Sequence, residues 1–180
     1  MNVKLVGSHA GISIGEDGAS QMGIEDVALA CSMPGIAVVV PADANSTRKA
    51  TRAMLEHNGP VYLRCGRIEV PEIYGADAPF TIGKANTVRE GKDLTIIANG
   101  LMVGIAMDAA AALSKTGVNA RVIDMHTVKP IDEQAIINAA KETGRIVVAE
   151  EHLMAGGLGS AVASVVARTT PVPMEFVNLG

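Results

Sequence analysis

Residues 37–65 read AVVVPADANSTRKATRAMLEHNGPVYLRC, two apolar runs separated by a polar segment with helical spacing. The run Ala37–Val40 is wholly apolar, which is typical of a strand covered on both faces of its sheet. Asp43 or Asn45 can cap a helix that extends to about His57, and the glycine at 59 can end it. Residues 61–65 supply the next strand. The order strand, helix, strand predicts a βαβ unit with parallel strands.

The same alternation continues on both sides of this unit. Strands are predicted at residues 3–8, 86–89, 94–98, 120–125, 145–150 and 174–177, and helices at 23–32, 103–115, 131–143 and 158–168. Pro130 is expected at the first position of its helix, where a missing N–H costs nothing. The pattern predicts an α/β fold with three α/β/α layers and mostly parallel sheets.

A long connection divides the chain. Residues 66–83 contain Pro71, Gly75 and Pro79 and show no sustained period over about 18 residues, which is long for a loop inside one domain. We therefore predict a first unit at 1–66, a linker at 67–82 and a second domain at 83–180. Residues 1–66 bury little surface for an independent domain, so we expect them to be the C-terminal part of a larger one.

Composition excludes several classes of protein. The 180 residues carry a net charge of −4 and only two Tyr, two Phe and no Trp, which argues against nucleic-acid binding and against binding to an anionic membrane. Cys31 and Cys65 form no CxxC motif and no histidine pair has HxxxH spacing, so no metal site is expected. Without a long apolar run or a signal-peptide layout, the sequence predicts a cytoplasmic protein.

The loop after the first predicted strand holds the most informative side chains. Residues 8–21 read SHAGISIGEDGASQ and combine His9, Asp17 and Gln21 with three glycines. A histidine and a carboxylate can bind vicinal hydroxyls and move a proton, and Arg67, just past a strand end, suits a phosphate. Together they predict a pocket for a phosphorylated polyol. From spacing alone, a loop without a ligand and a solvated Arg67 stay open as alternatives.

Other polar groups favour structural roles. Arg64 lies inside a predicted strand and is interpreted as a packing or ion-pair residue. Residues 150–152, Glu-Glu-His, end a strand with no nucleophile or metal partner and indicate a structural or interface role. The GGLG run at 156–159 is interpreted as a site of close helix packing, because it lacks a full phosphate-binding fingerprint.

The run GEDGASQM at 15–22, preceded by His9 and followed by IED at 24–26, resembles transketolase. It is most similar to the animal and archaeal enzymes, in which Gln stands where bacterial and yeast enzymes have His. Further segments match the family in the same order: PAD at 41–43, YLRCGR at 62–67, DMHTVKPID at 124–132, EEH at 150–152 and GGLG at 156–159. The resemblance spans nearly the whole chain.

The resemblance implies an activity and roles for four residues. Transketolases transfer a two-carbon ketol unit between phosphorylated sugars, as in the pentose phosphate pathway, with thiamine diphosphate and Mg²⁺, and they form dimers. By the same resemblance, His9 is catalytic and binds substrate, Asp17 binds substrate hydroxyls, and Arg67 binds the sugar phosphate. Gln21 lies beside the cofactor. No residue of the chain is assigned to the metal.

Departures from the family pattern indicate a partial enzyme. The glutamate that activates the cofactor, the aromatic residues that stack on its ring, and the GDG motif with a distant Asn that binds diphosphate and metal are all missing. We expect the end of the pyrimidine-binding domain plus the C-terminal domain, inactive without the N-terminal region. The alternatives are a fragment of 1-deoxyxylulose-5-phosphate synthase or of a 2-oxo acid dehydrogenase β chain, and a non-catalytic module that only builds a dimer.

Overall fold

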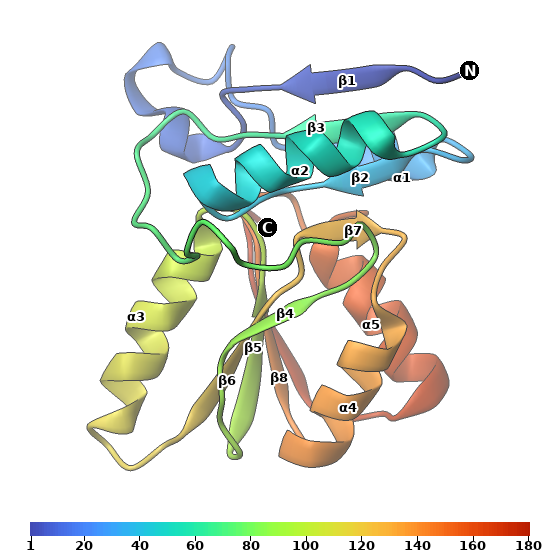
Figure 1. Cartoon of the computed structure of the whole chain (residues 1–180). Helices are drawn as coiled ribbons and strands as arrows, with labels where there is room; N and C mark the ends of the chain where they lie inside the picture. The colour runs from blue at the N-terminus through green and yellow to red at the C-terminus, as the bar shows by residue number, and fades with distance from the viewer.

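Two β-sheets lie one above the other in the computed structural model, which describes residues 1–180 (Figure 1). The first sheet has four strands, in the order β1 (Lys4–Gly7), β3 (Val61–Arg64), β2 (Ala37–Val39) and β7 (Thr127–Lys129). The first three are parallel, and β7 is antiparallel to β2. The second sheet has five strands, in the order β4 (Asn86–Arg89), β6 (Ala120–Asp124), β5 (Leu94–Ala98), β8 (Ile146–Ala149) and β9 (Met174–Val177).

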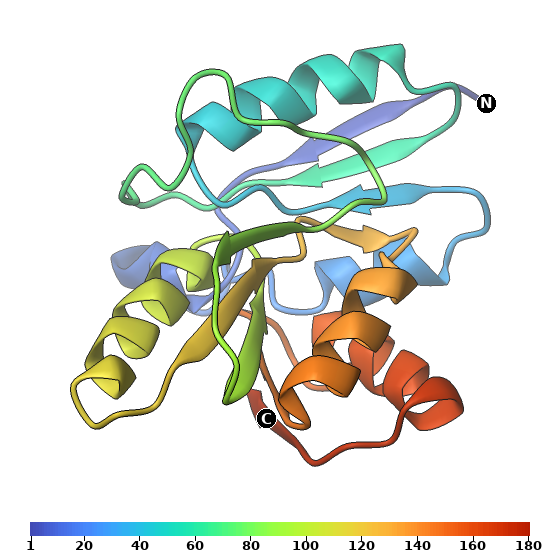
Figure 2. The same ribbon diagram turned by 60° about the horizontal axis from the view of Figure 1, so that its bottom comes forward.

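Helices lie on both faces of each sheet. They are α1 (Asp26–Ser32), α2 (Ala44–Glu56), α3 (Met102–Ser114), α4 (Glu133–Thr143) and α5 (Leu158–Thr169), with a 3₁₀ segment η1 (Ile12–Asp17) between β1 and α1. Figure 2 shows α2 on one face of the first sheet and α1 on the other. None of the helices combines the length and the apolar character needed to cross a bilayer.

The β2–α2–β3 unit confirms the prediction made from residues 37–65. Val38 and Val39 are 0% and 1% exposed, because successive side chains of a strand point to opposite faces and both faces are covered. Val39 packs in a cluster with Ala50 and Met54 of α2. Val38 packs instead in the cluster that contains Val27 of α1. Burial on both faces explains the unbroken apolar run.

The second sheet is the middle of three layers. Ile96 of β5 faces α3 and packs in the cluster that contains Val103, whereas its neighbour Ile97 packs in the cluster that contains Ile136 of α4 and Val162 of α5. All neighbouring strands are parallel except β4, which runs antiparallel to β6. The predicted α/β class with mostly parallel sheets and helices on both sides is confirmed.

The predicted strands and helices are all present, with small shifts at their ends, but one detail is wrong. Pro130 is not the first residue of a helix, because α4 begins at Glu133. Asp132 is the N-cap, and its carboxylate accepts the N–H of Ala135 at 3.1 Å. The helix α4 therefore begins directly after an acidic N-cap residue, and Pro130 belongs to the turn before that cap.

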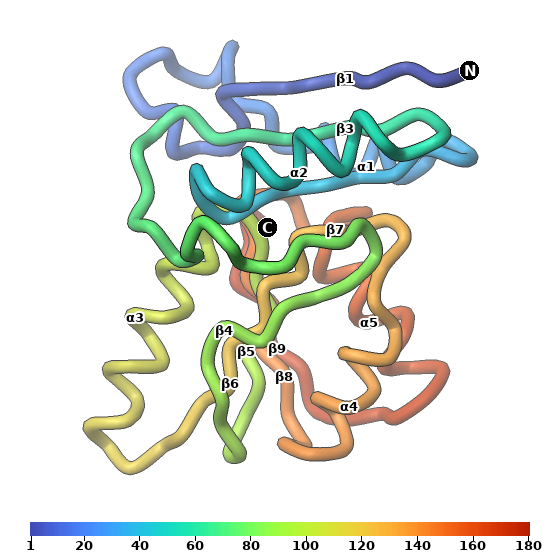
Figure 3. Tube along the Cα trace, viewed as in Figure 1, coloured from blue at the N-terminus to red at the C-terminus, as the bar shows by residue number.

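The connection between the two sheets is ordered by its own contacts. Figure 3 shows it leaving β3, passing the start of α3 and reaching β4. Tyr74 donates its hydroxyl to Asp124 at 2.7 Å, and Phe80 stacks on His126 with ring centroids 4.0 Å apart. The predicted boundaries of the linker and of the two units stay predictions. The strand β7, which the sequence analysis missed, pairs with β2 and joins the later part of the chain to the first sheet.

Candidate functional site

The glycine-rich loop begins at the carboxyl end of β1 and is fixed at its root. Ala10 donates its N–H to the carbonyl of Cys65 at 3.2 Å, and Gly11 donates to the carbonyl of Gly23 at 2.7 Å. The chain then turns through η1. Gly11, Gly15 and Gly18 have φ values of 81°, 72° and 78°, a region that other residues rarely adopt. The glycines therefore permit the tight turns that bring the loop back over the end of β3.

His9 lies at the start of this loop with an exposed imidazole. Its φ of 64° makes it the one residue other than glycine in the left-handed region. The ring Nδ1 lies 2.9 Å from the hydroxyl of Ser8. An exposed imidazole at a strand end, in a backbone conformation that is uncommon for histidine, can take or give a proton to a ligand at the loop.

Asp17 and Arg67 are brought together, although 50 positions in the sequence separate them. The guanidinium Nη1 of Arg67 lies 2.9 Å from the carboxylate of Asp17 and donates to the carbonyl of Ile14 at 3.0 Å. Its Nη2 lies 3.6 Å from the exposed carboxylate of Glu16. A guanidinium has five N–H donors, so these contacts leave donors for an oxyanion. The pair can bind a hydroxyl and a phosphate side by side.

Gln21 lies in the exposed turn that precedes α1. Its backbone N–H donates to the carbonyl of Gly18 at 3.0 Å, and its side chain has no hydrogen bond. No hydrogen bond joins Gln21 or His9 to the Asp17–Arg67 pair. The structure thus connects two of the four predicted residues directly and places the other two on the same loop.

An ion pair between the buried Arg64 and the partly buried Asp26 supports the loop from below. Arg64 lies 2.9 Å from the carboxylate of Asp26 and donates to the carbonyls of Gly23 and Glu151, each at 2.9 Å. Tyr62 donates to the same Asp26 carboxylate at 2.6 Å, and because of burial and this neighbour its pKa is raised well above the usual value. The ion-pair role predicted for Arg64 is confirmed.

The segment after β8 docks the second unit against this region. The Glu150 carboxylate accepts the N–H groups of Leu158 and Gly159, each at 2.7 Å, at the start of α5. Burial raises the pKa of Glu150, although these bonds oppose the shift. His152 accepts the N–H of Ala28 at 3.3 Å, so residues 150–152 make structural contacts within the chain, which agrees with the structural or interface role that the sequence indicated. A Cβ on Gly159 would lie 2.9 Å from the Phe176 ring, which confirms close packing there.

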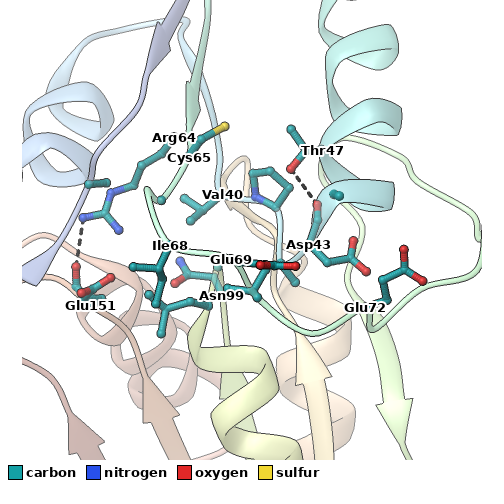
Figure 4. A pocket seen from close by; sticks show the side chains of 18 of the residues that line it. Val40, Asp43, Thr47, Arg64, Cys65, Ile68, Glu69, Glu72, Asn99 and Glu151 are labelled. Atoms are coloured by element: carbon teal, nitrogen blue, oxygen red, sulfur yellow. Dashed lines mark hydrogen bonds between the residues drawn. The ribbon is translucent and has the colours of Figure 1, made fainter. Parts of the chain in front are cut away.

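A cavity of about 480 Å³ lies beside the loop, where β2, β3 and β5 end (Figure 4). Pro41 follows β2, Gly66 follows β3, and Asn99 follows β5, so the cavity lies at the carboxyl ends of parallel strands. Ala10, at the root of the loop, and Glu151, which contacts the loop from the segment after β8, both line the cavity. The four predicted site residues are absent from the lining, so the cavity is a neighbour of the loop site and not the same pocket.

The chain offers neither a metal site nor an aromatic surface at this edge. No three His, Cys, Asp or Glu side chains are grouped so that they could hold a metal ion. The four aromatic residues, Tyr62, Tyr74, Phe80 and Phe176, are absent from the cavity lining.

Two family models cover most of the chain. Residues 1–72 match the transketolase pyrimidine binding domain, and residues 83–179 match the transketolase C-terminal domain. The chain belongs to the transketolase family. The resemblance seen in the sequence is confirmed, and the chain corresponds to the C-terminal section of a transketolase.

Relatives in the transketolase family include proteins named as separate subunits or sections. An apulose-4-phosphate transketolase subunit from Phocaeicola vulgatus is 42% identical over 99% of this chain and 57% of its own length. The putative transketolase C-terminal section of Methanocaldococcus jannaschii is 43% identical over 93% of this chain and 52% of its own length. A solved structure described as a split gene transketolase, inactive beta4 tetramer, superposes with a TM-score of 0.94 and 44% identity, over 100% of this chain and 58% of that one. The chain thus spans little more than half the length of these relatives.

Proposed function

We propose that the chain supplies part of the active site of a transketolase that transfers a two-carbon ketol unit between phosphorylated sugars. The observation that supports this most directly is the Asp17–Arg67 pair, 2.9 Å apart, which joins the loop that presents His9 after β1 to the segment after β3. A phosphorylated sugar has both vicinal hydroxyls and a phosphate. An acid and a guanidinium side by side match these two groups.

We assign a separate role to each of the four residues. His9 exchanges a proton with the substrate beside the reacting carbon, Asp17 accepts hydrogen bonds from sugar hydroxyls, and Arg67 binds the phosphate. Gln21 contacts the cofactor. A phosphate that binds Arg67 adds to the negative charge of Asp17, so the guanidinium also offsets repulsion between the two anions. We propose that the substrates are pentose phosphates and related sugar phosphates, as in the pentose phosphate pathway.

The residues present do not by themselves fit thiamine diphosphate and Mg²⁺. The metal would need grouped oxygen ligands, and the ring would need an aromatic side chain to stack on. No such group of ligands is present, and no aromatic residue lines the cavity at this edge. We propose that both groups are held mainly by another part of the assembled enzyme and that Gln21 is a minor contact. Thiamine diphosphate would supply the stabilisation of the carbanion. This chain would supply residues that bind the substrate and a residue that carries a proton.

The open side of the first sheet supports assembly with that other part. β1 is the outermost strand (Figure 1), and its neighbouring residues Leu5 and Val6 are 48% and 60% exposed. Adjacent strand residues point to opposite faces, so β1 is uncovered on both, unlike β2. Parallel sheets are normally covered on both sides. We propose that the N-terminal transketolase region packs here and that two such complete units form a dimer.

Reconstitution tests this function. The chain alone, given thiamine diphosphate and Mg²⁺, should not turn over xylulose 5-phosphate with an aldose phosphate acceptor. When it is mixed with a polypeptide that carries the N-terminal transketolase region, called here the complementary polypeptide, the mixture should catalyse this reaction. His9→Ala should reduce kcat of the mixture by about a hundredfold or more. Glu175→Ala, an exposed acid on β9, is the matched control and should retain full activity.

Four results would contradict the proposal. Turnover by the chain alone would show that it holds the cofactor itself. A complex that uses pyruvate in place of a ketose phosphate would favour the synthase or dehydrogenase alternatives. Full activity of His9→Ala would remove the residue assignment, and a stable complex without any activity would favour a module that only builds the assembly.

A further inference from the structure

We propose that Glu151 is a positioning residue, held in the second unit of the chain, that sets the conformation of the loop carrying His9 and Asp17. This inference rests on the proposed function of that loop. Glu151 follows β8 and is more than 130 positions away from the loop in the sequence. It contacts none of the four residues assigned to substrate or cofactor by a hydrogen bond, so its effect has to pass through the loop.

The Glu151 carboxylate binds the middle of the loop. It accepts the backbone N–H of Ser13 with one oxygen, and the Ser13 hydroxyl lies 3.1 Å from the other. Ser13 belongs to η1, between His9 and Asp17. Glu151 is only 8% exposed, so these bonds form where little water competes for the carboxylate. A buried carboxylate with two loop donors is a strong restraint on the position of η1.

The same residue is anchored from behind. Its backbone carbonyl accepts a hydrogen bond from Arg64 at 2.9 Å (Figure 4), and Arg64 is bound to Asp26 below the loop. A Cβ on Gly11 would overlap the carboxyl group of Glu151, so the loop root is shaped to leave room for this side chain. Glu151 therefore cannot shift without disturbing either its anchor or the loop.

The loop has few other restraints. Of the six residues of η1 only Ile14 is buried, and neither end of η1 has a side-chain cap. A 3₁₀ segment of this kind has low intrinsic stability, and a segment with few buried contacts opens locally at small free-energy cost. Arg67 also binds the carbonyl of Ile14, but Arg67 is assigned to the substrate and is partly exposed. Glu151 is thus the buried side chain that restrains η1.

The test uses the assembled enzyme with wild-type chain, Glu151→Ala, Glu151→Gln and Ser13→Ala, and with Glu175→Ala as the control. Hydrogen exchange of the amides at 11–17 should become about tenfold faster or more in Glu151→Ala, with little change in α4 or β5. KM for the phosphorylated acceptor should rise by about the same factor, with a smaller change in kcat. Glu151→Gln keeps the shape and one acceptor oxygen, and it should stay within about threefold of wild type.

Ser13→Ala separates positioning from folding, because it removes a single hydroxyl on the other side of the contact. It should accelerate exchange in the loop less than Glu151→Ala, and the double variant should match Glu151→Ala, since both act on one interaction. Unchanged exchange at 11–17 in Glu151→Ala, or additive effects in the double variant, would overturn the inference. If Glu151→Ala does not assemble, Ser13→Ala decides the matter. Loop exchange and KM equal to those of the wild type in Ser13→Ala would then overturn the inference. If the wild-type assembly lacks ketol transfer, the proposed function fails, while the exchange data still decide the role of Glu151.

Discussion

Arg64 and Arg168 both form ion pairs, but we expect their contributions to the free energy of unfolding to differ because their surroundings differ. Arg64 is buried and also donates to two carbonyl groups. Arg64→Met would leave Asp26 with the Tyr62 hydroxyl as its remaining side-chain donor and would leave the Glu151 carbonyl without a donor. We expect a loss of about 3–5 kcal/mol in the free energy of unfolding. The Arg168–Glu133 pair, 2.7 Å apart, has side chains 53% and 51% exposed. Arg168→Met should cost less than about 1 kcal/mol.

Urea unfolding of the two variants checks this contrast. Similar losses for the two arginines would mean that burial does not govern these pairs. A small loss for Arg64→Met alone would mean that the surrounding residues or water replace the guanidinium.

Asp124 should make stability depend on pH near neutrality. It is fully buried, one of its oxygens accepts the Tyr74 hydroxyl and the other has no partner. Burial raises its pKa from 3.8 to about 7, although the Tyr74 bond opposes the shift. Between these two values the folded state binds more protons than the unfolded state. Stability contributed by Asp124 is therefore greatest below about pH 4 and falls as pH rises toward 7, by up to about 1.4 kcal/mol per pH unit.

Asp124→Asn removes this titratable group, so the pH dependence of its stability can be compared with that of the wild type. The unfolding free energy of wild type minus that of the variant should fall between about pH 4 and pH 7 and level off above. Burial lowers the pKa of His126 to about 4, which gives the opposite slope, but that slope is present in both proteins. A difference that is flat across this range would show that Asp124 has an ordinary pKa.

Residue types at strand ends allowed part of the site to be predicted. The glycines and acids at 15–18 indicated a turn over a ligand, and Arg67 followed a strand that the sequence defined well. The ion pair between Asp17 and Arg67 could not be predicted, because its geometry depends on how η1 folds back over β3. The contact of Glu151 with Ser13 was also missed, since it joins two sheets whose relative placement no local pattern specifies.

At the scale of elements, Asp43 does more than cap α2. One carboxylate oxygen accepts the N–H of Ser46 at 2.7 Å, and the other accepts the N–H groups of Ile73 and Tyr74, each at 2.8 Å. The helix start and the linker are thus held by one side chain. Burial alone would raise the pKa of Asp43, but these hydrogen bonds outweigh it and leave the pKa below its usual value.

Asp43→Ala should cost at least about 2 kcal/mol in unfolding free energy, more than the loss of an ordinary cap. Ser46→Ala, which removes only the hydroxyl that Asp43 N–H donates to at 2.9 Å, should cost about 1 kcal/mol. Because the folded pKa is lowered, the contribution of Asp43 is present above about pH 4 and is lost as pH falls through the folded pKa. Equal costs for the two variants at neutral pH would contradict the linker role.

Elements with strong apolar patterns were predicted from the sequence, and weak ones were not. β2, β5 and β8 are nearly pure apolar runs because both their faces are covered. β7 has three residues, one of them a lysine, so no run or alternation marks it as a strand. η1 has no period at all because glycines set its turns. What the sequence cannot encode locally is pairing between segments about 90 residues apart, as in β2 with β7.

At the scale of the whole molecule, the uncovered strand β1 is the surface on which we propose that the N-terminal transketolase region packs. Leu5→Lys should change the unfolding free energy of the chain by less than about 0.5 kcal/mol, because Leu5 is already half exposed. It should weaken binding to the complementary polypeptide by at least about tenfold, since the interface would bury an unpaired charge. Sedimentation of the mixture measures this.

Ile105→Lys is the matched control, an apolar side chain of α3 that is 50% exposed on a different face. It should leave complex formation unchanged. Assembly that tolerates a lysine at position 5 but fails with a lysine at position 105 would place the contact surface on α3 and not on β1.

The antiparallel pairing of β7 with β2 has a consequence for modularity. The family boundary near the linker suggests a natural point for exchanging parts between enzymes, yet Val38 pairs with Lys129, and Val39 with Thr127. A chimera joined at residue 82 would take its fourth strand from the donor of the second part. Recombination at the linker alone would therefore place residues 37–39 and residues 127–129, which pair as β2 and β7, in sequences from different enzymes. A stable hybrid would need both segments from the same parent.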